Sequence, residues 1–294
     1  MESASDATID CVRRALAEDL GREDLGLAGD RTSALALPDV GRGRARLVSK
    51  GRGVIAGLAC AVTAFTLLDA EARIDVTRRD GDAVVPGDEV LRVEAGMRAL
   101  LAAERTALNF LQRLSGIATL TRRFVEAVAG TGARILDTRK TTPGLRQFEK
   151  AAVVAGGGVN HRYGLFDQVL LKENHFALAA PVEYEEVVRR CSANENAPVI
   201  AEARSVEEAI AAVRGGADVV LLDNFAPGEP LRAAVAAVHA TAHELSVAAE
   251  TEASGGVDLA SVRAFAESGV DRISIGALTH SAPALDLSLL VEGA

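Results

Sequence analysis

Two cations follow a short apolar run near the middle of the chain. Arg139 and Lys140 come directly after ARILDT (133–138), which has the composition of a buried strand. Later apolar runs also end in residues that can do chemistry, namely Lys172, Glu202, Asp223, Glu252 with Ser254, and Gly276. Cations that share one face repel one another unless an anion of several charges neutralises them. The pattern therefore predicts a strongly acidic ligand.

Carboxylates and glycine-bearing turns narrow the chemistry of this ligand. Glu202 and Asp223, on two successive runs, suit the hydroxyl groups of a sugar, a Mg²⁺ ion or a developing positive charge. EASGGV (252–257) and ISIGALTHS (273–281) place glycine after the last two runs, where barrel enzymes commonly bind phosphate through backbone N–H groups. Cations, carboxylates and glycine turns together indicate a phosphorylated sugar.

The elements that must position these residues alternate regularly from residue 133 onward. Helical patterns separate strand-like runs, which read ARILDT, QVLLKE, PVIAEA, VVLLDN, SVAAETEA and RISIGA. This alternation predicts a parallel sheet of the α/β class. Any one charge at a strand end could be a solvated loop residue, but the same feature after six successive runs favours a (β/α) barrel over a doubly wound sheet. Only six strands are clear in the sequence, so the barrel could be incomplete or atypical.

The first third of the chain has a different texture. Apolar residues at helical spacing predict an opening helix over 9–20, and short runs broken by glycine turns from about 44 to 95 predict an antiparallel sheet. A helix is expected over 58–70 within that region. Residues 99–129 are apolar at 3.6-residue spacing, and Gly116 is expected to mark a break between two helices.

Composition excludes several classes of function. The chain of 294 residues is 49% hydrophobic, enough for a large core in one large or two moderate domains. A net charge of −9 without a basic stripe makes nucleic acid an improbable partner. The cysteines Cys11, Cys60 and Cys191 form no CxxC motif and fit free thiols in a reducing cytoplasm. An acidic N-terminus and the lack of an apolar run of about 18 residues predict a cytoplasmic protein without a membrane span.

Several stretches together resemble the quinolinate phosphoribosyltransferase family. They are ERTALNFLQRLSGIAT (104–119), DTRKTTPGLR (137–146), GGGVNHRYGL (156–165), LLKENH (170–175), LLDNF (221–225), EASGGV (252–257) and GALTHS (276–281). The resemblance runs from about residue 12 to the C-terminus. It implies decarboxylating phosphoribosyl transfer from phosphoribosyl pyrophosphate to quinolinate, with Mg²⁺, giving nicotinate mononucleotide, CO₂ and pyrophosphate for NAD biosynthesis.

The resemblance also implies an architecture. An N-terminal α/β sandwich domain is expected over 1–112, completed by 277–294, and an atypical α/β barrel domain over 113–276. Members of this family form homodimers or larger homo-oligomers in which the arginine of the ERT motif, here Arg105, enters the active site of the partner. We therefore expect a homo-oligomer with a shared site.

The resemblance assigns a role to each site residue. The dicarboxylate is expected to bind Arg105 from the partner, Arg139, His161, Arg162 and Lys172. Lys140 and Lys172 are expected on the pyrophosphate side, and Glu202 and Asp223 on the ribose hydroxyls and Mg²⁺, possibly through water, so that Lys140, Glu202 and Asp223 form the expected catalytic set. The 5-phosphate is expected to bind Ser254, Gly255, Gly256, Gly276 and Ala277.

One strand departs from the family pattern. Where the family has Glu-x-Glu, this chain reads VIAEAR (199–204), so that Ile200 replaces the first glutamate and Arg204 replaces a usual acidic residue. We expect a weaker Mg²⁺ dependence or a shifted substrate preference from these changes. Two other functions stay open: a related phosphoribosyltransferase that uses nicotinate or another pyridine carboxylate, and a non-catalytic barrel that binds sugar phosphates.

Overall fold

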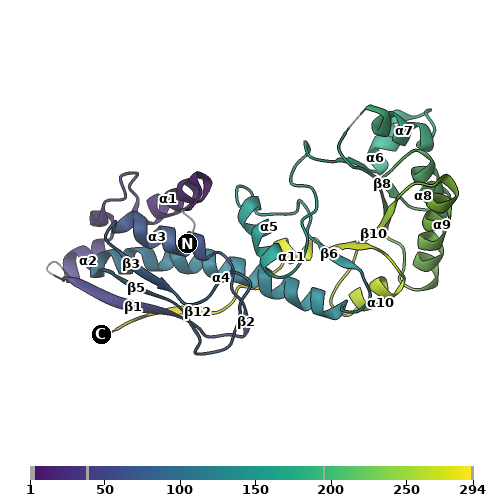
Figure 1. Ribbon diagram of the computed structural model, residues 1–294. Helices are drawn as coiled ribbons and strands as arrows, with labels where there is room; N and C mark the ends of the chain where they lie inside the picture. Colours follow the sequence, from purple (N-terminus) through teal and green to yellow (C-terminus); the bar gives the residue numbers. More distant parts are fainter. Residues whose placement is uncertain (1–3, 38–39, 195, 293–294) are drawn as a thin grey trace. The chain divides into compact units, whose positions relative to one another are not determined.

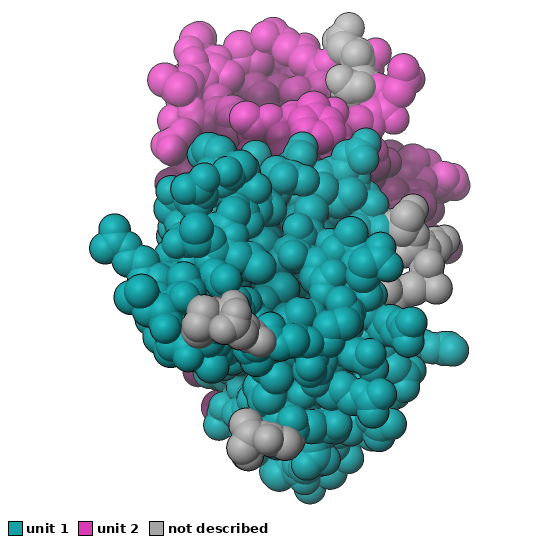
Figure 2. Space-filling view, turned by 90° about the vertical axis from the view of Figure 1, so that its left-hand side faces the viewer, with its two compact units in different colours: residues 1–120, 147–156, 282–294 teal, residues 121–146, 157–281 magenta. Residues whose placement is uncertain are grey.

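The computed structural model describes residues 4–37, 40–194 and 196–292 (Figure 1). The chain divides into two compact units, shown in different colours in Figure 2. Unit 1 comprises Met1–Leu120, Gln147–Gly156 and Ala282–Ala294, and unit 2 comprises Thr121–Arg146 and Gly157–Ser281. The domain boundaries expected at residues 112 and 276 stay a prediction.

Unit 1 is built on an antiparallel sheet with the order β12-β1-β5-β3 among its described residues. The strands are β12 (Leu287–Val291), β1 (Arg42–Ser49), β5 (Glu89–Gly96) and β3 (Arg73–Val76). Ala45 of β1 lies opposite Val291 on one side and Val93 on the other. Ala45 and Leu47 are buried whereas Arg44 and Arg46 are exposed, so only one face of the sheet is covered. The predicted antiparallel sheet is confirmed, and β2 (Gly53–Val54) pairs separately with β4 (Ala83–Val84).

The helices of unit 1 include the predicted opening helix, α1 (Asp6–Leu20), which packs on α3 (Leu58–Leu68). The Ser5 hydroxyl accepts a hydrogen bond from the Thr8 N–H and caps the start of α1. Gly21, which caps its end, has the left-handed conformation. Short helices follow at η1 (Leu27–Gly29) and α2 (Arg31–Ala36), and α5 (Arg146–Ala155) comes later in the chain. The predicted helices over 9–20 and 58–70 are confirmed.

The long helix α4 (Met97–Ala127) is continuous, so the predicted break at Gly116 is wrong. A side chain at this position would place its Cβ 2.1 Å from the carbonyl oxygen of Pro283. Glycine is therefore required because the chain returning from unit 2 passes directly over the helix. Neighbouring side chains also fasten α4, since the hydroxyl groups of Ser115 and Thr119 accept hydrogen bonds from the backbone N–H groups of Ala56 and Val54.

Gly116→Ala is expected to destabilise the protein by about 1–3 kcal/mol through overpacking, although alanine is normally the better helix former. Urea unfolding of unmodified and substituted protein measures this difference in the free energy of unfolding. Asn109→Ala, at an exposed position of the same helix, is the control and should change it by less than about 0.5 kcal/mol. An unchanged or raised stability of Gly116→Ala would contradict the close approach of Pro283.

Unit 2 contains a parallel sheet whose strand order is β6-β11-β10-β9-β8-β7 among the described residues (Figure 1). The strands are β6 (Arg134–Leu136), β7 (Val169–Leu171), β8 (Val199–Ala203), β9 (Val219–Asp223), β10 (Glu250–Ser254) and β11 (Arg272–Ser274). All six coincide with the predicted runs. Because β11, the last strand, pairs with β6, the first, the sheet curls into a barrel.

The barrel is atypical at the other side of β6. On that side Leu136 makes a single bridge, to Val159, and no described strand joins this bridge to β7. The chain between them, residues 160–168, has no helix or strand. The predicted fold class, an atypical α/β barrel with an N-terminal α/β unit, is confirmed.

Helices surround the strands of unit 2 (Figure 1). They are α6 (Glu173–Ala179), α7 (Tyr184–Asn194), α8 (Val206–Arg214), α9 (Glu229–Leu245), α10 (Val262–Glu267) and α11 (Ala277–His280). Every residue of β8 is buried, as expected for a strand with the barrel core on one side and helices on the other. Within the described residues, no helix combines the length and apolar character needed to cross a membrane.

Candidate active site

A cavity of about 690 Å³ opens at the carboxyl ends of the strands of unit 2. Most of the predicted site residues line it, namely Arg139, Lys140, His161, Arg162, Lys172, Asp223, Ser254, Gly255, Gly256, Gly276 and Ala277. Parallel strands bring their carboxyl ends to one face, which is why residues from distant parts of the chain meet here. Glu202 and Arg105 are not among the lining residues.

The turn after β6 presents the two cations from which the polyanion was predicted. Thr138 accepts a hydrogen bond from the Lys140 N–H at 3.1 Å, and the Thr141 N–H donates to the Arg139 carbonyl at 2.9 Å. The Thr279 hydroxyl in turn donates to the Lys140 carbonyl at 2.8 Å. These bonds fix the backbone of the turn, so both exposed cationic side chains start from a rigid base.

A second pair of polar residues comes from the irregular loop that follows Val159. Arg162 is only 9% exposed, and its guanidinium Nη1 donates to the Gln168 carbonyl at 3.2 Å. Burial and then repulsion by Arg139 lower the pKa of Arg162. The two guanidinium groups are therefore close enough to repel each other, which a bound dianion would relieve.

Lys172 stands at the start of α6, where the His175 ring accepts a hydrogen bond from its N–H at 2.9 Å. Its ammonium nitrogen lies 3.2 Å from Oε2 of Glu202. Glu202 is 6% exposed, and its other oxygen accepts a hydrogen bond from the Glu173 N–H at 3.3 Å. The structure thus places Glu202 behind Lys172 rather than in the cavity wall.

Asp223, the last residue of β9, lines the cavity directly. Burial, followed by the negative charge of Glu202, raises the pKa of Asp223, against the opposing effect of Lys172. A carboxylate held near another carboxylate in a partly buried site is stabilised by a cation. The pair therefore fits a Mg²⁺ ion in the usual manner, with few protein ligands and the rest from phosphate and water. The described residues contain no cluster of three or more metal-ligating side chains, and the Mg²⁺ site stays a prediction.

Glycine turns form the wall of the cavity after β10 and β11. Gly255 and Gly256 have φ angles of +97° and +63°, which residues other than glycine rarely adopt. A Cβ on Gly255 would also meet the side-chain oxygen of Asn224 at 2.4 Å, and one on Gly276 would meet Cδ of Lys140 at 2.9 Å. Backbone conformation and close packing therefore require glycine at 255, whereas a side chain at 276 would displace the flexible Lys140.

The remaining predicted residue, Arg105, is exposed on α4 in unit 1. The structure therefore leaves its side chain accessible to another molecule. Sequence reasoning missed other residues in the cavity wall, which are Thr138, Asn224, Ser274 and His280, and it noted Glu252 at a strand end without giving it a role. Each stands within or beside one of the motifs that follow the strands. Its position near a strand end was therefore the signal that could have placed it in the cavity.

The two departures from the family pattern have structural partners. Ile200 is fully buried and packs with Val219 and Leu221 in the core of unit 2. Arg204 pairs with Glu208 at 3.3 Å and with Glu173 at 3.5 Å. Ile200 thus contributes apolar packing in place of a charge, while the effect on Mg²⁺ dependence stays a prediction.

A parallel barrel with cations, carboxylates and a glycine-rich wall at its strand ends defines an enzyme of the barrel class that binds polyanionic ligands. Family models describe the two parts of the chain: the quinolinate phosphoribosyl transferase N-terminal domain matches residues 30–115, and the C-terminal domain matches residues 117–290. The chain belongs to the quinolinate phosphoribosyl transferase family.

Individual relatives agree with this assignment. The chain is 42% identical to a probable nicotinate-nucleotide pyrophosphorylase (carboxylating) of Archaeoglobus fulgidus, over 90% of this chain and 98% of that protein. It is 40% identical to the nicotinate-nucleotide pyrophosphorylase (carboxylating) of Mycobacterium leprae, over 97% of each. The solved structure of the nicotinate-nucleotide pyrophosphorylase from Francisella tularensis superposes with a TM-score of 0.88 at 35% identity, covering 98% of this chain and 96% of that one.

Proposed function

We propose that this protein transfers a phosphoribosyl group from phosphoribosyl pyrophosphate to quinolinate, releasing pyrophosphate and CO₂ and forming nicotinate mononucleotide. The observation that carries the proposal is one cavity that combines Arg139, Lys140, Arg162 and Lys172 with a glycine-rich wall. Both substrates are polyanions, and their charge would neutralise this cluster. The names of the relatives support the same reaction.

The pyridine dicarboxylate is proposed to bind at the side of the cavity formed by Arg139, Arg162 and Lys172. A guanidinium group binds a carboxylate through two parallel hydrogen bonds, and quinolinate carries two adjacent carboxylates. The mutual repulsion of Arg139 and Arg162 supports this placement, because it favours a doubly charged ligand over a singly charged one. Nicotinate, with one carboxylate, would leave part of that repulsion uncompensated.

The sugar donor is proposed to lie across the carboxylates and the glycine turns. Ser254, Gly255, Gly256, Gly276 and Ala277 would bind its 5-phosphate, with Lys140 and Lys172 on the pyrophosphate side. Asp223 would hold the ribose hydroxyls and Mg²⁺, and Glu202 would act beside it through Lys172 and water. When bound, Mg²⁺ supplies charge neutralisation for the leaving pyrophosphate.

The protein then has a limited task in the reaction. The ring nitrogen attacks the anomeric carbon of the sugar while the bond to pyrophosphate breaks, which places positive charge on the ribose. Asp223 and Glu202 stabilise that charge, and Lys140 and Lys172 stabilise the leaving group. The C–CO₂ bond next to the quaternised nitrogen then breaks, its electron pair stays on the ring carbon, and a proton from solvent replaces the CO₂.

The assembly is proposed to be a homodimer or a larger homo-oligomer. Arg105 would reach the cavity of a partner subunit and complete the cation cluster around the dicarboxylate. Its exposure on α4, where another subunit can reach it, supports this arrangement.

Incubation with quinolinate, phosphoribosyl pyrophosphate and Mg²⁺ tests the function, with CO₂ and nicotinate mononucleotide as the measured products. The purified protein is expected to form both in equal amounts, and nicotinate in place of quinolinate is expected to give little nucleotide. Arg139→Met, purified in the same way, controls for contaminating enzyme. Turnover with nicotinate but not with quinolinate would contradict the proposal and favour the related enzyme class, and turnover with neither would favour a binding protein.

A further inference from the structure

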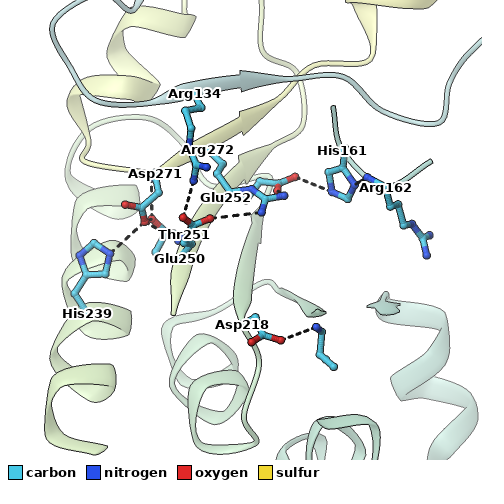
Figure 3. Close-up of polar contacts among 11 residues, drawn as sticks. Arg134, His161, Arg162, Asp218, His239, Glu250, Thr251, Glu252, Asp271 and Arg272 are labelled. Carbon is cyan, nitrogen blue, oxygen red and sulfur yellow. Dashed lines mark hydrogen bonds and ion pairs between the residues drawn. The ribbon is translucent and has the colours of Figure 1, made fainter. Parts of the chain in front are cut away.

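One residue of the cavity wall is a buried carboxyl group that contacts two basic side chains. Glu252, in the middle of β10, is fully buried, and one of its oxygens lies 3.3 Å from Nε2 of His161 (Figure 3). The other oxygen lies 2.8 Å from the Arg272 guanidinium. These two partners lower the pKa of Glu252 even though burial alone would raise it. Glu252 thus has one oxygen beside His161 and the other beside Arg272 inside the barrel, although the reaction as proposed does not use it.

His161 connects this carboxyl group to the loop that carries Arg162. Its backbone N–H donates to the buried Asp137 carboxylate at 2.8 Å, and its ring Nδ1 accepts a hydrogen bond from the Arg162 N–H at 2.7 Å. A ring nitrogen that accepts a hydrogen bond carries no proton. The proton of the neutral ring is therefore on Nε2, which faces Glu252.

Arg162 depends on such a connection because its loop has no regular secondary structure. Residues 160–168 lie in the chain between the Leu136–Val159 bridge and β7, where no described strand links β6 to β7. Arg162 is nonetheless buried, next to the like charge of Arg139. Its backbone bond to His161 and its side-chain bond to Gln168 hold it in this unfavourable position.

The charges behind Glu252 continue through the barrel to its opposite end. Arg272 also lies 3.5 Å from Glu250, which pairs with Arg134 at 2.6 Å (Figure 3). Glu250 and Glu252 are two residues apart on one strand and so point to the same side of the sheet. Glu250 is half exposed and pairs with arginines only, whereas Glu252 also contacts His161. The chain thus provides a matched control for Glu252.

We propose that Glu252 is a positioning residue for quinolinate: it holds His161 in the Nε2–H tautomer, and this tautomer places Arg162 through its Nδ1. The proposal rests on the proposed function for the identity of the ligand. It gives His161 a task different from the direct carboxylate contact that the family resemblance implied. The tautomer itself can be measured on the protein without substrates.

The first experiment reads the tautomer by ¹⁵N NMR of the histidine rings. The chain contains only five histidines, and His161→Asn identifies the signal of His161. The unmodified protein is expected to show His161 with its proton on Nε2, and Glu252→Gln is expected to change this pattern whereas Glu250→Gln is not. A His161 ring with its proton on Nδ1 in the unmodified protein would overturn the proposal, whatever the protein does with quinolinate.

The second experiment separates positioning from folding by kinetics. Glu252→Gln is expected to raise the KM for quinolinate about tenfold or more while the KM for phosphoribosyl pyrophosphate changes less than about twofold. Glu250→Gln should leave both constants unchanged. A folded Glu252→Gln enzyme with an unchanged KM for quinolinate would overturn the proposal. If the unmodified protein does not use quinolinate at all, the proposed function fails, and the NMR result still decides whether Glu252 sets the tautomer.

A third comparison keeps the proposal testable if Glu252→Gln does not fold. In His161→Asn the amide oxygen can take the place of Nδ1 and accept from the Arg162 N–H, whereas the longer side chain of His161→Gln reaches toward Glu252 instead. His161→Asn is therefore expected to keep a lower KM for quinolinate than His161→Gln. Equal or reversed values would show that the bond to Arg162 is not what matters.

Discussion

Mixing the Arg105→Ala and Arg139→Ala proteins is expected to restore activity that neither has alone. Each substitution removes a cation proposed to bind the dicarboxylate, and the loss of one charged partner of a bound ligand corresponds to a decrease in kcat/KM of about a hundredfold or more. In a mixed dimer, the subunit with intact Arg139 receives intact Arg105 from its neighbour. One of its two sites is then complete.

The size of the recovery follows from symmetry. Random exchange makes about half of the dimers mixed, so about a quarter of all sites, and about a quarter of the unmodified activity, should return. A mixture of Arg139→Ala with Arg162→Ala is the control, because both residues belong to the receiving cavity and no mixed dimer has an intact site. Native mass spectrometry verifies that subunits have exchanged. Exchange without recovery would refute a shared site.

Asp223→Asn is expected to lower activity by about a hundredfold or more and yet to raise the melting temperature at neutral pH. The activity falls because the proposed ligand of the ribose and Mg²⁺ loses its charge. The stability rises because burial and Glu202 raise the pKa of Asp223 in the folded state. The folded protein then binds the proton more tightly than the unfolded chain, so stability decreases as the pH rises through the window between the two pKa values.

Thermal unfolding at several pH values checks this sign. The melting temperature of Asp223→Asn should exceed that of the unmodified protein by a degree or two, in order of magnitude, near pH 7, and the difference should shrink toward pH 4 as Asp223 becomes protonated. Asp218→Asn, just before the same strand, is the control: Asp218 accepts a hydrogen bond from the Val199 N–H, which an asparagine oxygen can also accept. A lower melting temperature for Asp223→Asn would contradict the raised pKa.

Elements with a strong local pattern could be predicted from the sequence. The strands β6 to β11 were found because each is a short apolar run between helical patterns, and α1 and α3 because of their helical spacing. The cavity residues Arg139, Lys172 and Asp223 followed from the same rhythm, since parallel strands place their carboxyl ends together. These predictions needed only the order of residues within each element.

Features that depend on distant partners could not be predicted. Glycine within a helical pattern suggests a break, and for this reason Gly116 was interpreted as one. The actual reason for glycine is its contact with Pro283, which is far along the chain and cannot be inferred from the local sequence. The ion pair between Glu202 and Lys172 likewise joins two strands that are about 30 residues apart in the chain. The chain alone also gave no sign that Glu252 contacts His161.

The sequence by itself determined the α/β class, the polyanionic character of the ligand and, through its motifs, the family. These depend on periodicity, residue type and spacing, which are local properties. The tertiary structure alone decided which side chains face the cavity, which stand behind it and how the irregular loop holds Arg162. The physical reason is that burial and ion pairing are set by whichever residues meet in space, and strands distant in the chain supply those neighbours.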